Sequence, residues 1–255
     1  MAVNRMRALS PKQQELLERD AKVLSAARGL ILERGYYGVT MDHIARASGC
    51  RKGTLYHRFA SKEDVFVALA ADSLERRSAM MERAAAFKGR SRERVLALGE
   101  AVTLFTRLHT DDSRILHTTM GPIREKASPE RFLALVEQEK RNIQFVNGIL
   151  RDAVDEGDLV VESEDTLHEI ALGTWGLVDG CFTLVESGIP QLVLGINNPF
   201  YRVWRSFNRL ADAYGWKPLF DEWDYEESLK QVRLQIFPEE SVQLYGEDNW
   251  YGDHG

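Results

Sequence analysis

Apolar residues recur every three or four positions along most of the chain, the spacing typical of amphipathic helices. The first such run follows Ser10 and Pro11, a typical helix start, and stops at Gly35. Thr40 is a typical N-cap for a short second helix reaching about Ala47, and Ser61 for a long one. These signals predict a succession of helices in the N-terminal part.

The rest of the chain follows the same rhythm. Apolar runs predict helices near 91–108, 111–119, 129–156, 164–188 and 199–214. No hairpin signal and no internal repeat stands between them. We therefore expect an all-α fold.

One short predicted helix, RKGTLYHRF at residues 51–59, is polar over nearly its whole surface. Only Leu55 and Phe59, four positions apart, are placed to face a core. Gly53 costs roughly 1 kcal/mol relative to alanine inside a helix. Such a helix is suited to contact another polar molecule, and the missing side chain lets a phosphate or a base approach the backbone.

The charge distribution changes the picture further. Residues 1–62 carry 12 basic and 5 acidic residues, whereas residues 63–255 carry 21 basic and 34 acidic ones. A basic block on an acidic chain is typical of a module that binds a polyanion. A solvated basic face without a partner is the alternative.

Two short helices joined by a turn, the second of them basic, indicate a helix-turn-helix. The small Ala45 lets the helices cross closely, Gly49 supplies the turn, and Leu55 fills the core beneath. In this motif the second helix enters the major groove of DNA, so its outer face is polar. The sequence therefore predicts DNA binding by residues 40–62.

The segments AARGLILERGYYGVTMDHIARASG and KGTLYHRFASKEDVF resemble the DNA-binding domain of TetR-family transcriptional regulators. The resemblance implies a homodimer of all-helical subunits that represses transcription by binding a palindromic DNA operator. It also implies a variable C-terminal domain in which a small molecule binds and releases the DNA. The positions that match DNA-contacting places of the family are Thr40, Lys52, Gly53, Thr54, Tyr56, His57 and Lys62.

Arg51 departs from the family pattern, which has a small hydroxyl residue at this place. The change removes the N-cap of the second helix, worth about 1 kcal/mol. It also adds a guanidinium to the predicted DNA-binding residues. Arg51 is placed either to read a guanine or to hold a phosphate, and the sequence leaves both open.

The segment 170–185 is apolar around nearly its whole circumference, which is typical of a helix buried on more than one side. Gly173, Gly176 and Gly180 would let another backbone approach closely. We expect this helix and the one at 199–214 to form a four-helix dimer interface. An intramolecular core helix is the alternative.

A few polar residues interrupt the apolar stripes of the C-terminal part. Asp179 shares a stripe with Trp175 and Phe182, and none of the arginines at 107, 114, 124, 141 and 151 is well placed to pair with it, although His117 is a possible partner. We predict an apolar cavity for an apolar or aromatic effector, lined by Phe105, His117, Met120, Phe145, Trp175, Asp179 and Phe182. Core packing of these aromatics, with Asp179 in a salt bridge or hydrogen bond, is the alternative.

Residues 218–255 hold 10 acidic and 2 basic residues together with seven aromatic ones. So many aromatics are unusual for a solvated tail. We expect this acidic aromatic extension to fold back onto the C-terminal domain. The predicted organisation is a three-helix helix-turn-helix DNA-binding domain at 1–65, a larger helical ligand-binding and dimerisation domain at 66–217, and the extension at 218–255.

Other classes of protein find little support. The chain lacks a nucleophile elbow, a phosphate loop, a paired-acid motif and metal-ligand spacing, so we expect no enzyme, no cofactor and no metal. No apolar run is long enough to cross a membrane, and the basic N-terminus lacks the apolar stretch of a secretory signal. We expect a cytoplasmic repressor. The alternative is a helix-turn-helix regulator without a metabolite ligand, controlled by a protein partner that docks on the extension.

Overall fold

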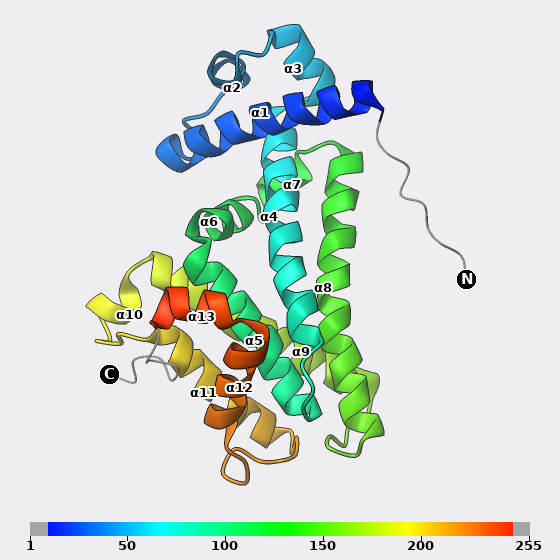
Figure 1. Cartoon of the computed structure of the whole chain (residues 1–255), viewed down its shortest axis with the longest axis vertical. Coiled ribbons are helices and arrows are strands. Elements are labelled where there is room, and N and C mark those ends of the chain that lie inside the picture. Colours follow the sequence, from blue (N-terminus) through cyan, green and yellow to red (C-terminus); the bar gives the residue numbers. More distant parts are fainter. Residues whose placement is uncertain (1–9, 247–255) are drawn as a thin grey trace. The chain divides into compact units, whose positions relative to one another are not determined.

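The computed structural model describes residues 10–246, and every regular element in that range is a helix, which confirms the all-α prediction (Figure 1). The helices are α1 (Pro11–Arg34), α2 (Met41–Ser48), α3 (Lys52–Arg58), α4 (Lys62–Ala85), α5 (Ser91–Leu108), α6 (Thr110–Thr118), α7 (Pro122–Glu125), α8 (Pro129–Asp155), α9 (Glu164–Glu186), α10 (Ile189–Leu192), α11 (Pro199–Ala213), α12 (Tyr225–Ile236) and α13 (Pro238–Tyr245). None of them combines the length and the apolar content needed to span a bilayer.

The chain forms two compact units. The first contains the residues up to Ser73 and the segment Arg114–Val136, and the second contains Leu74–Ser113 and the residues from Glu137 onward. The helices α4, α6 and α8 each contribute residues to both units. The division of the sequence at 65/66 and 217/218 remains a prediction.

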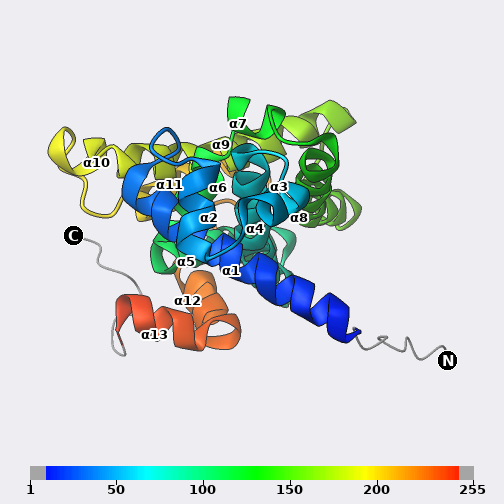
Figure 2. The same cartoon turned by 90° about the horizontal axis from the view of Figure 1, so that it is seen from above.

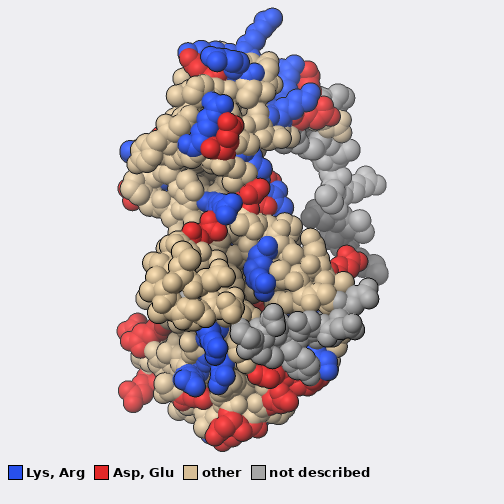
Figure 3. Space-filling view, turned by 90° about the vertical axis from the view of Figure 1, so that its left-hand side faces the viewer, with Lys and Arg blue, Asp and Glu red and all other residues tan. Residues whose placement is uncertain are grey.

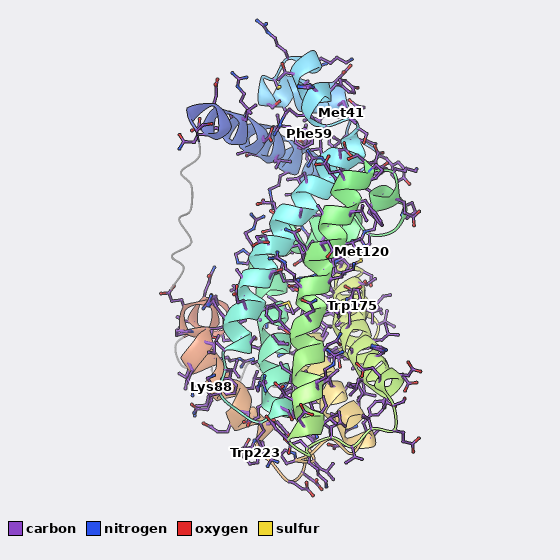
Figure 4. All side chains as sticks on the ribbon, turned by 90° about the vertical axis from the view of Figure 1, so that its right-hand side faces the viewer. Met41, Phe59, Lys88, Met120, Trp175 and Trp223 are labelled. Carbon is purple, nitrogen blue, oxygen red and sulfur yellow. The ribbon has the colours of Figure 1, made fainter. Side chains whose placement is uncertain are left out.

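In the first unit, α2 packs against α1 and α3 against α2 (Figure 1). Thr40 caps α2, because its Oγ1 accepts a hydrogen bond from the backbone N–H of His43 at 3.2 Å. Gly49 ends the helix with φ of 66°, a conformation that favours glycine. The side chains of Ile44, Leu55 and Phe59 are buried (Figure 4 labels Phe59). The helix-turn-helix predicted from the sequence is therefore present.

In the second unit, α9, α11, α12 and α13 all contact α5. Figure 2 shows α12 and α13 next to each other, and they also contact one another. The aromatic side chains of Tyr225 and Phe237 are buried at about 1% and 0% exposure. The prediction that the C-terminal extension folds back is thereby confirmed for residues 218–246; Trp250 and Tyr251 lie outside the described residues.

Arg92 on α5 anchors this arrangement. Its side chain is fully buried, and its guanidinium donates to Asp212 Oδ1 at 2.7 Å and to the carbonyl oxygens of Trp216 and Pro218, each at 2.8 Å. It also lies over the ring of Tyr225, 4.7 Å from the centroid. One cation thus joins α5 to the end of α11 and to the start of the extension.

The contacts of α9 differ along its surface. A Cβ atom added at Gly173 would lie 3.2 Å from Leu210 of α11, so this glycine permits close packing within the chain. Leu172 and Trp175 are exposed at 68% and 47%, and a Cβ atom built at Gly176 or Gly180 would meet nothing within 4 Å (Trp175 is labelled in Figure 4). The described residues therefore cover only part of the surface of this helix.

Candidate functional site

The predicted DNA-binding residues form one exposed polar surface in the first unit. Seven of the eight, all except Lys62, are exposed: Thr40, Arg51, Lys52, Gly53, Thr54, Tyr56 and His57. Leu55 lies on the opposite side of α3 and is completely buried. Phe59, which follows the end of α3, is also buried, with 1% of its surface exposed. The buried pair fixes α3 on the core, so the remaining side chains point away from it.

The charged residues around this surface have both signs. Figure 3 shows Lys and Arg side chains around α1 to α3 at the top of the view, with acidic side chains between them. Lys52 Nζ lies 2.6 Å from Asp42 Oδ1, and both side chains are exposed. The hydrogen bond to Lys52 lowers the pKa of Asp42, and the same contact raises the pKa of Lys52. Both groups are therefore charged at neutral pH.

No contact or backbone conformation among the described residues requires a glycine at position 53. A Cβ atom built there would meet nothing within 4 Å, and the residue has no positive φ that would favour glycine. Alanine would stabilise the helix by roughly 1 kcal/mol. No described residue therefore requires glycine at this position, and its contact with DNA remains a prediction.

Arg51 precedes α3 in an extended conformation, and no side-chain hydrogen bond caps the helix. The predicted loss of the N-cap is confirmed. Arg51 is exposed, as are the neighbouring residues Lys52, Gly53 and Thr54. The contact of Arg51 with DNA, to a base or to a phosphate, remains a prediction.

Lys62 differs from the other predicted contacts because its ammonium is already engaged. Nζ donates to the carbonyl oxygens of Tyr36 at 3.0 Å and Val39 at 3.3 Å, and lies 3.9 Å from the centroid of the Tyr36 ring. The hydroxyl of Tyr36 donates to Glu63, a contact that raises the tyrosine pKa to about 12. Lys62 therefore holds the α1–α2 link beside α4, and its contact with DNA remains a prediction.

Other residues that support α3 have no signal in the sequence. Arg58 forms a hydrogen-bonded ion pair with Asp20 of α1. Arg131 of α8 donates to the carbonyl oxygen of Arg58 at 3.1 Å and lies over the Phe59 ring at 4.5 Å. The buried Asp64 accepts from the backbone N–H groups of Ala60 and Ser128. Their partners are far away in the sequence, so spacing alone does not reveal them.

The seven residues predicted to bind an effector are divided between the two units. His117 and Met120 belong to the first, whereas Phe105, Phe145, Trp175, Asp179 and Phe182 belong to the second. Phe105 and Phe182 are buried, Phe145 and Asp179 are partly buried, and Trp175 is largely exposed. Their role in ligand binding remains a prediction.

Asp179 has an arginine near it after all. Arg77, which lies outside the set of arginines considered above, is partly buried, and burial lowers its pKa while the charges of Asp179 and Glu139 act in the opposite direction. The five arginines considered from the sequence did not include Arg77. The alternative, that Asp179 has a structural partner, gains support.

The second unit contains a cavity elsewhere. It has a volume of about 70 Å³ and lies between α5, α9, α11, α12 and α13. Its walls are mostly apolar or aromatic, with Phe200, Trp204 and Phe207 on α11, and Glu100, Arg107 and Arg233 add charge. None of the seven predicted effector residues lines it.

The N-terminal unit matches a known family. Residues 23–69 match the family described as bacterial regulatory proteins, tetR family. The repressor AcnR of Corynebacterium glutamicum is 36% identical over 55 residues, which are 22% of this chain and 29% of that protein. The chain thus spans less than a third of AcnR. The fatty acid metabolism regulator protein of Bacillus subtilis is 26% identical over 188 residues, 69% of this chain and 95% of that protein.

A solved structure extends the likeness to both units. The transcriptional regulator FadR from Bacillus subtilis, in complex with stearoyl-CoA, aligns with a TM-score of 0.55 and 19% identity, covering 74% of this chain and 96% of that one. At this identity the likeness concerns the fold, an N-terminal helix-turn-helix domain followed by a larger helical domain. Residues 23–69 thus match the DNA-binding region of the TetR family, and the likeness of the rest of the chain to solved structures concerns the fold.

Proposed function

We propose that the chain is a cytoplasmic DNA-binding repressor that binds a palindromic operator as a homodimer and is released by an apolar small molecule. The observation that carries this proposal is the exposed polar surface on and beside α3, above the buried Leu55 and Phe59. In a helix-turn-helix this helix lies in the major groove. The AcnR relatives are named repressors, which supports repression rather than activation.

The DNA contacts follow from side-chain chemistry. Lys52 would exchange its exposed partner Asp42 for a phosphate, and Thr40, Thr54, Tyr56 and His57 offer short donors to backbone oxygens. Lys62 holds the link before α2 and so keeps Thr40 in place. Most of these contacts fix the register on the duplex, and the sequence is read by few of them.

The homodimer is proposed from the uncovered face of α9. Leu172 and Trp175 are exposed on this helix, and Gly176, four positions after Leu172, leaves room for a second backbone. Large apolar side chains gathered on one exposed helix face are typical of an interface. A two-fold symmetric contact between two such faces would also place two copies of α3 to read a palindrome.

The effector is proposed to be apolar because the cavity of the second unit is lined mainly by apolar and aromatic side chains. The structural neighbour FadR contains stearoyl-CoA, a ligand with a long apolar chain. Control by a protein that docks on the C-terminal extension has less support, because Tyr225 and Phe237 are buried against the unit.

Selection of bound DNA from a random pool tests the proposal. We expect a palindrome with half-sites about one helical turn or somewhat more apart. Its affinity should fall steeply with salt, since several contacts are to phosphate. Recovery of no enriched sequence, together with equal binding of all duplexes, would contradict a specific repressor.

Gly53→Ala is expected to separate stability from DNA binding. The variant should be as stable as the parent or more stable by up to about 1 kcal/mol, because alanine favours the helix and its Cβ meets nothing in the chain. Its affinity for DNA should fall about tenfold or more for every sequence, because the added methyl group keeps the backbone away from the DNA. Thermal unfolding and fluorescence anisotropy measure the two effects.

Gly29→Ala is the matched control for this substitution. Gly29 lies inside α1, is exposed, and likewise has nothing within 4 Å of a built Cβ atom. It should give the same gain in stability and unchanged DNA affinity. Equal DNA affinity of both variants would show that no close approach occurs at Gly53.

Arg51→Ala and Tyr56→Phe are expected to act differently on specificity. Tyr56→Phe removes one hydroxyl and should weaken all duplexes alike, by about 1 kcal/mol. Arg51→Ala should change the preferred base at one position of each half-site if the guanidinium reads a guanine, and should only lower affinity and salt dependence if it holds a phosphate. Anisotropy titrations with single-base variants of the selected operator distinguish these outcomes.

A further inference from the structure

The cavity of the second unit is built partly by the C-terminal extension. Leu229 and Arg233 of α12 and Tyr245 of α13 line it together with residues of α5, α9 and α11. Figure 1 shows α12 and α13 in orange and red beside α5. The cavity therefore exists in this form only because residues 218–246 fold back.

One part of the lining is a buried charged cluster. Arg233 Nε donates to Glu100 Oε1 at 2.7 Å, and Arg233 Nη2 donates to the Tyr245 hydroxyl at 3.1 Å, which in turn donates to Glu100 at 3.3 Å. The side chains of Arg233 and Glu100 are only 6% and 5% exposed. The carboxylate of Glu100 is thus already neutralised by groups of the fold.

Arg107 adds a charge that this cluster does not balance. Its guanidinium lies 5.3 Å from the centroid of the Tyr245 ring, and the residue is exposed while also lining the cavity. Glu100, Arg107 and Arg233 are the charged residues of the lining, so its net charge is positive. A ligand with a negative group is favoured there over one with a positive group.

Trp204 provides a second, independent indication. Its ring lines the cavity, stacked on Tyr201 at 5.4 Å and edge-on to Phe220 at 5.7 Å. Its indole Nε1 is buried and has no hydrogen-bond partner among the described residues. A buried donor without an acceptor destabilises the fold. A ligand atom that accepts a hydrogen bond from this N–H would remove that cost.

We propose that this cavity, closed by the C-terminal extension, binds an apolar effector that carries one carboxylate or similar anionic group. The apolar body would contact the aromatic residues of α11. Arg107 would attract the anionic group, and the indole N–H of Trp204 would donate to an acceptor of the ligand. The release of DNA by this ligand rests on the proposed function, whereas its binding does not.

Decanoate and decylammonium test the ligand class, since they share one apolar chain and differ in the sign of the head group. The full-length chain is titrated with 1-anilinonaphthalene-8-sulfonate, an aromatic anion whose fluorescence rises in apolar sites, and each compound is used to displace it. We expect decanoate to compete at least tenfold more strongly than decylammonium. Equal competition, or no displacement by either, would overturn the proposal.

Two variants locate the site. Trp204→Phe keeps the ring and removes the donor, and should weaken decanoate about tenfold. Arg107→Gln should reduce the preference for decanoate over decylammonium about tenfold. The matched controls are Trp223→Phe and Arg209→Gln, whose residues lie outside the lining; both should behave as the parent chain.

Circular dichroism of each variant checks that the fold is intact; Arg107 is exposed, so its variant remains informative even where Trp204→Phe alters packing. Displacement that is unchanged in both variants would place the ligand elsewhere. DNA affinity is measured on the same samples. If decanoate bound without releasing DNA, the proposed effector control would be wrong and the binding site would stand. If DNA release did not depend on these variants, the assignment of the ligand to this cavity would be wrong and effector control would stand.

Discussion

Replacing Arg92 with methionine is expected to lower the free energy of unfolding by about 3–5 kcal/mol, the range found when one partner of a buried ion pair is removed. The guanidinium is completely buried, and methionine has no donor for the oxygens that surround it. Asp212 and the carbonyl groups of Asn208, Trp216 and Pro218 would each lose a hydrogen bond. Thermal and urea unfolding of the variant measure the loss.

Arg94→Met is the control for this prediction. Arg94 lies two positions further along α5 and forms an ion pair with Asp152 at 2.8 Å, with side chains 23% and 45% exposed. Partly exposed pairs contribute about 1 kcal/mol or less. If the two variants lost the same stability, the network around Arg92 would not be what holds α11 and the extension on α5.

The helix-turn-helix was predictable because its determinants are local. Thr40 caps α2, Gly49 has the positive φ that ends it, and Leu55 is completely buried, as the spacing of these residues indicates. Each signal depends on neighbours within one or two helical turns. The exposure of the surrounding polar residues then follows from the position of Leu55.

The cavity was not predictable in the same way. The stripe of Leu172, Trp175, Asp179 and Phe182 shows that α9 has an apolar face, but spacing does not show what covers it. In the structure Phe182 is buried while Leu172 and Trp175 are exposed, and the cavity is instead lined from α9 by Thr174, Leu177 and Val178. Its other walls include Glu100 and Arg233, which are 133 positions apart in the sequence.

The charged partners were missed for the same reason. Four helices lie between Arg77 on α4 and Asp179 on α9, and five lie between Arg92 on α5 and the residues it holds near the end of α11. A buried ion pair can form wherever the fold brings two side chains together, so its members carry no common spacing. Such pairs are found only once the packing is known.

Trp175→Glu is expected to convert a dimer into a monomer and to lower operator affinity more than a hundredfold. The side chain is 47% exposed on the face of α9 that its own chain leaves uncovered. In a two-fold symmetric interface the substitution occurs twice, and each carboxylate would be buried without a partner, at a cost of several kcal/mol. The monomer would bind one half-site and lose the contribution of the second.

Light scattering after size-exclusion chromatography measures the oligomeric state, and anisotropy with the selected operator measures affinity. Leu133→Glu is the control, because Leu133 is an apolar residue of α8, 58% exposed, that belongs to the other unit. It should leave both quantities unchanged. A Trp175→Glu variant that stays dimeric would exclude this face of α9 as the interface. A half-site alone lacks the contacts that the second copy of α3 provides, so a monomeric variant should lose affinity. A monomeric variant with full operator affinity would instead show that a single chain suffices for DNA binding.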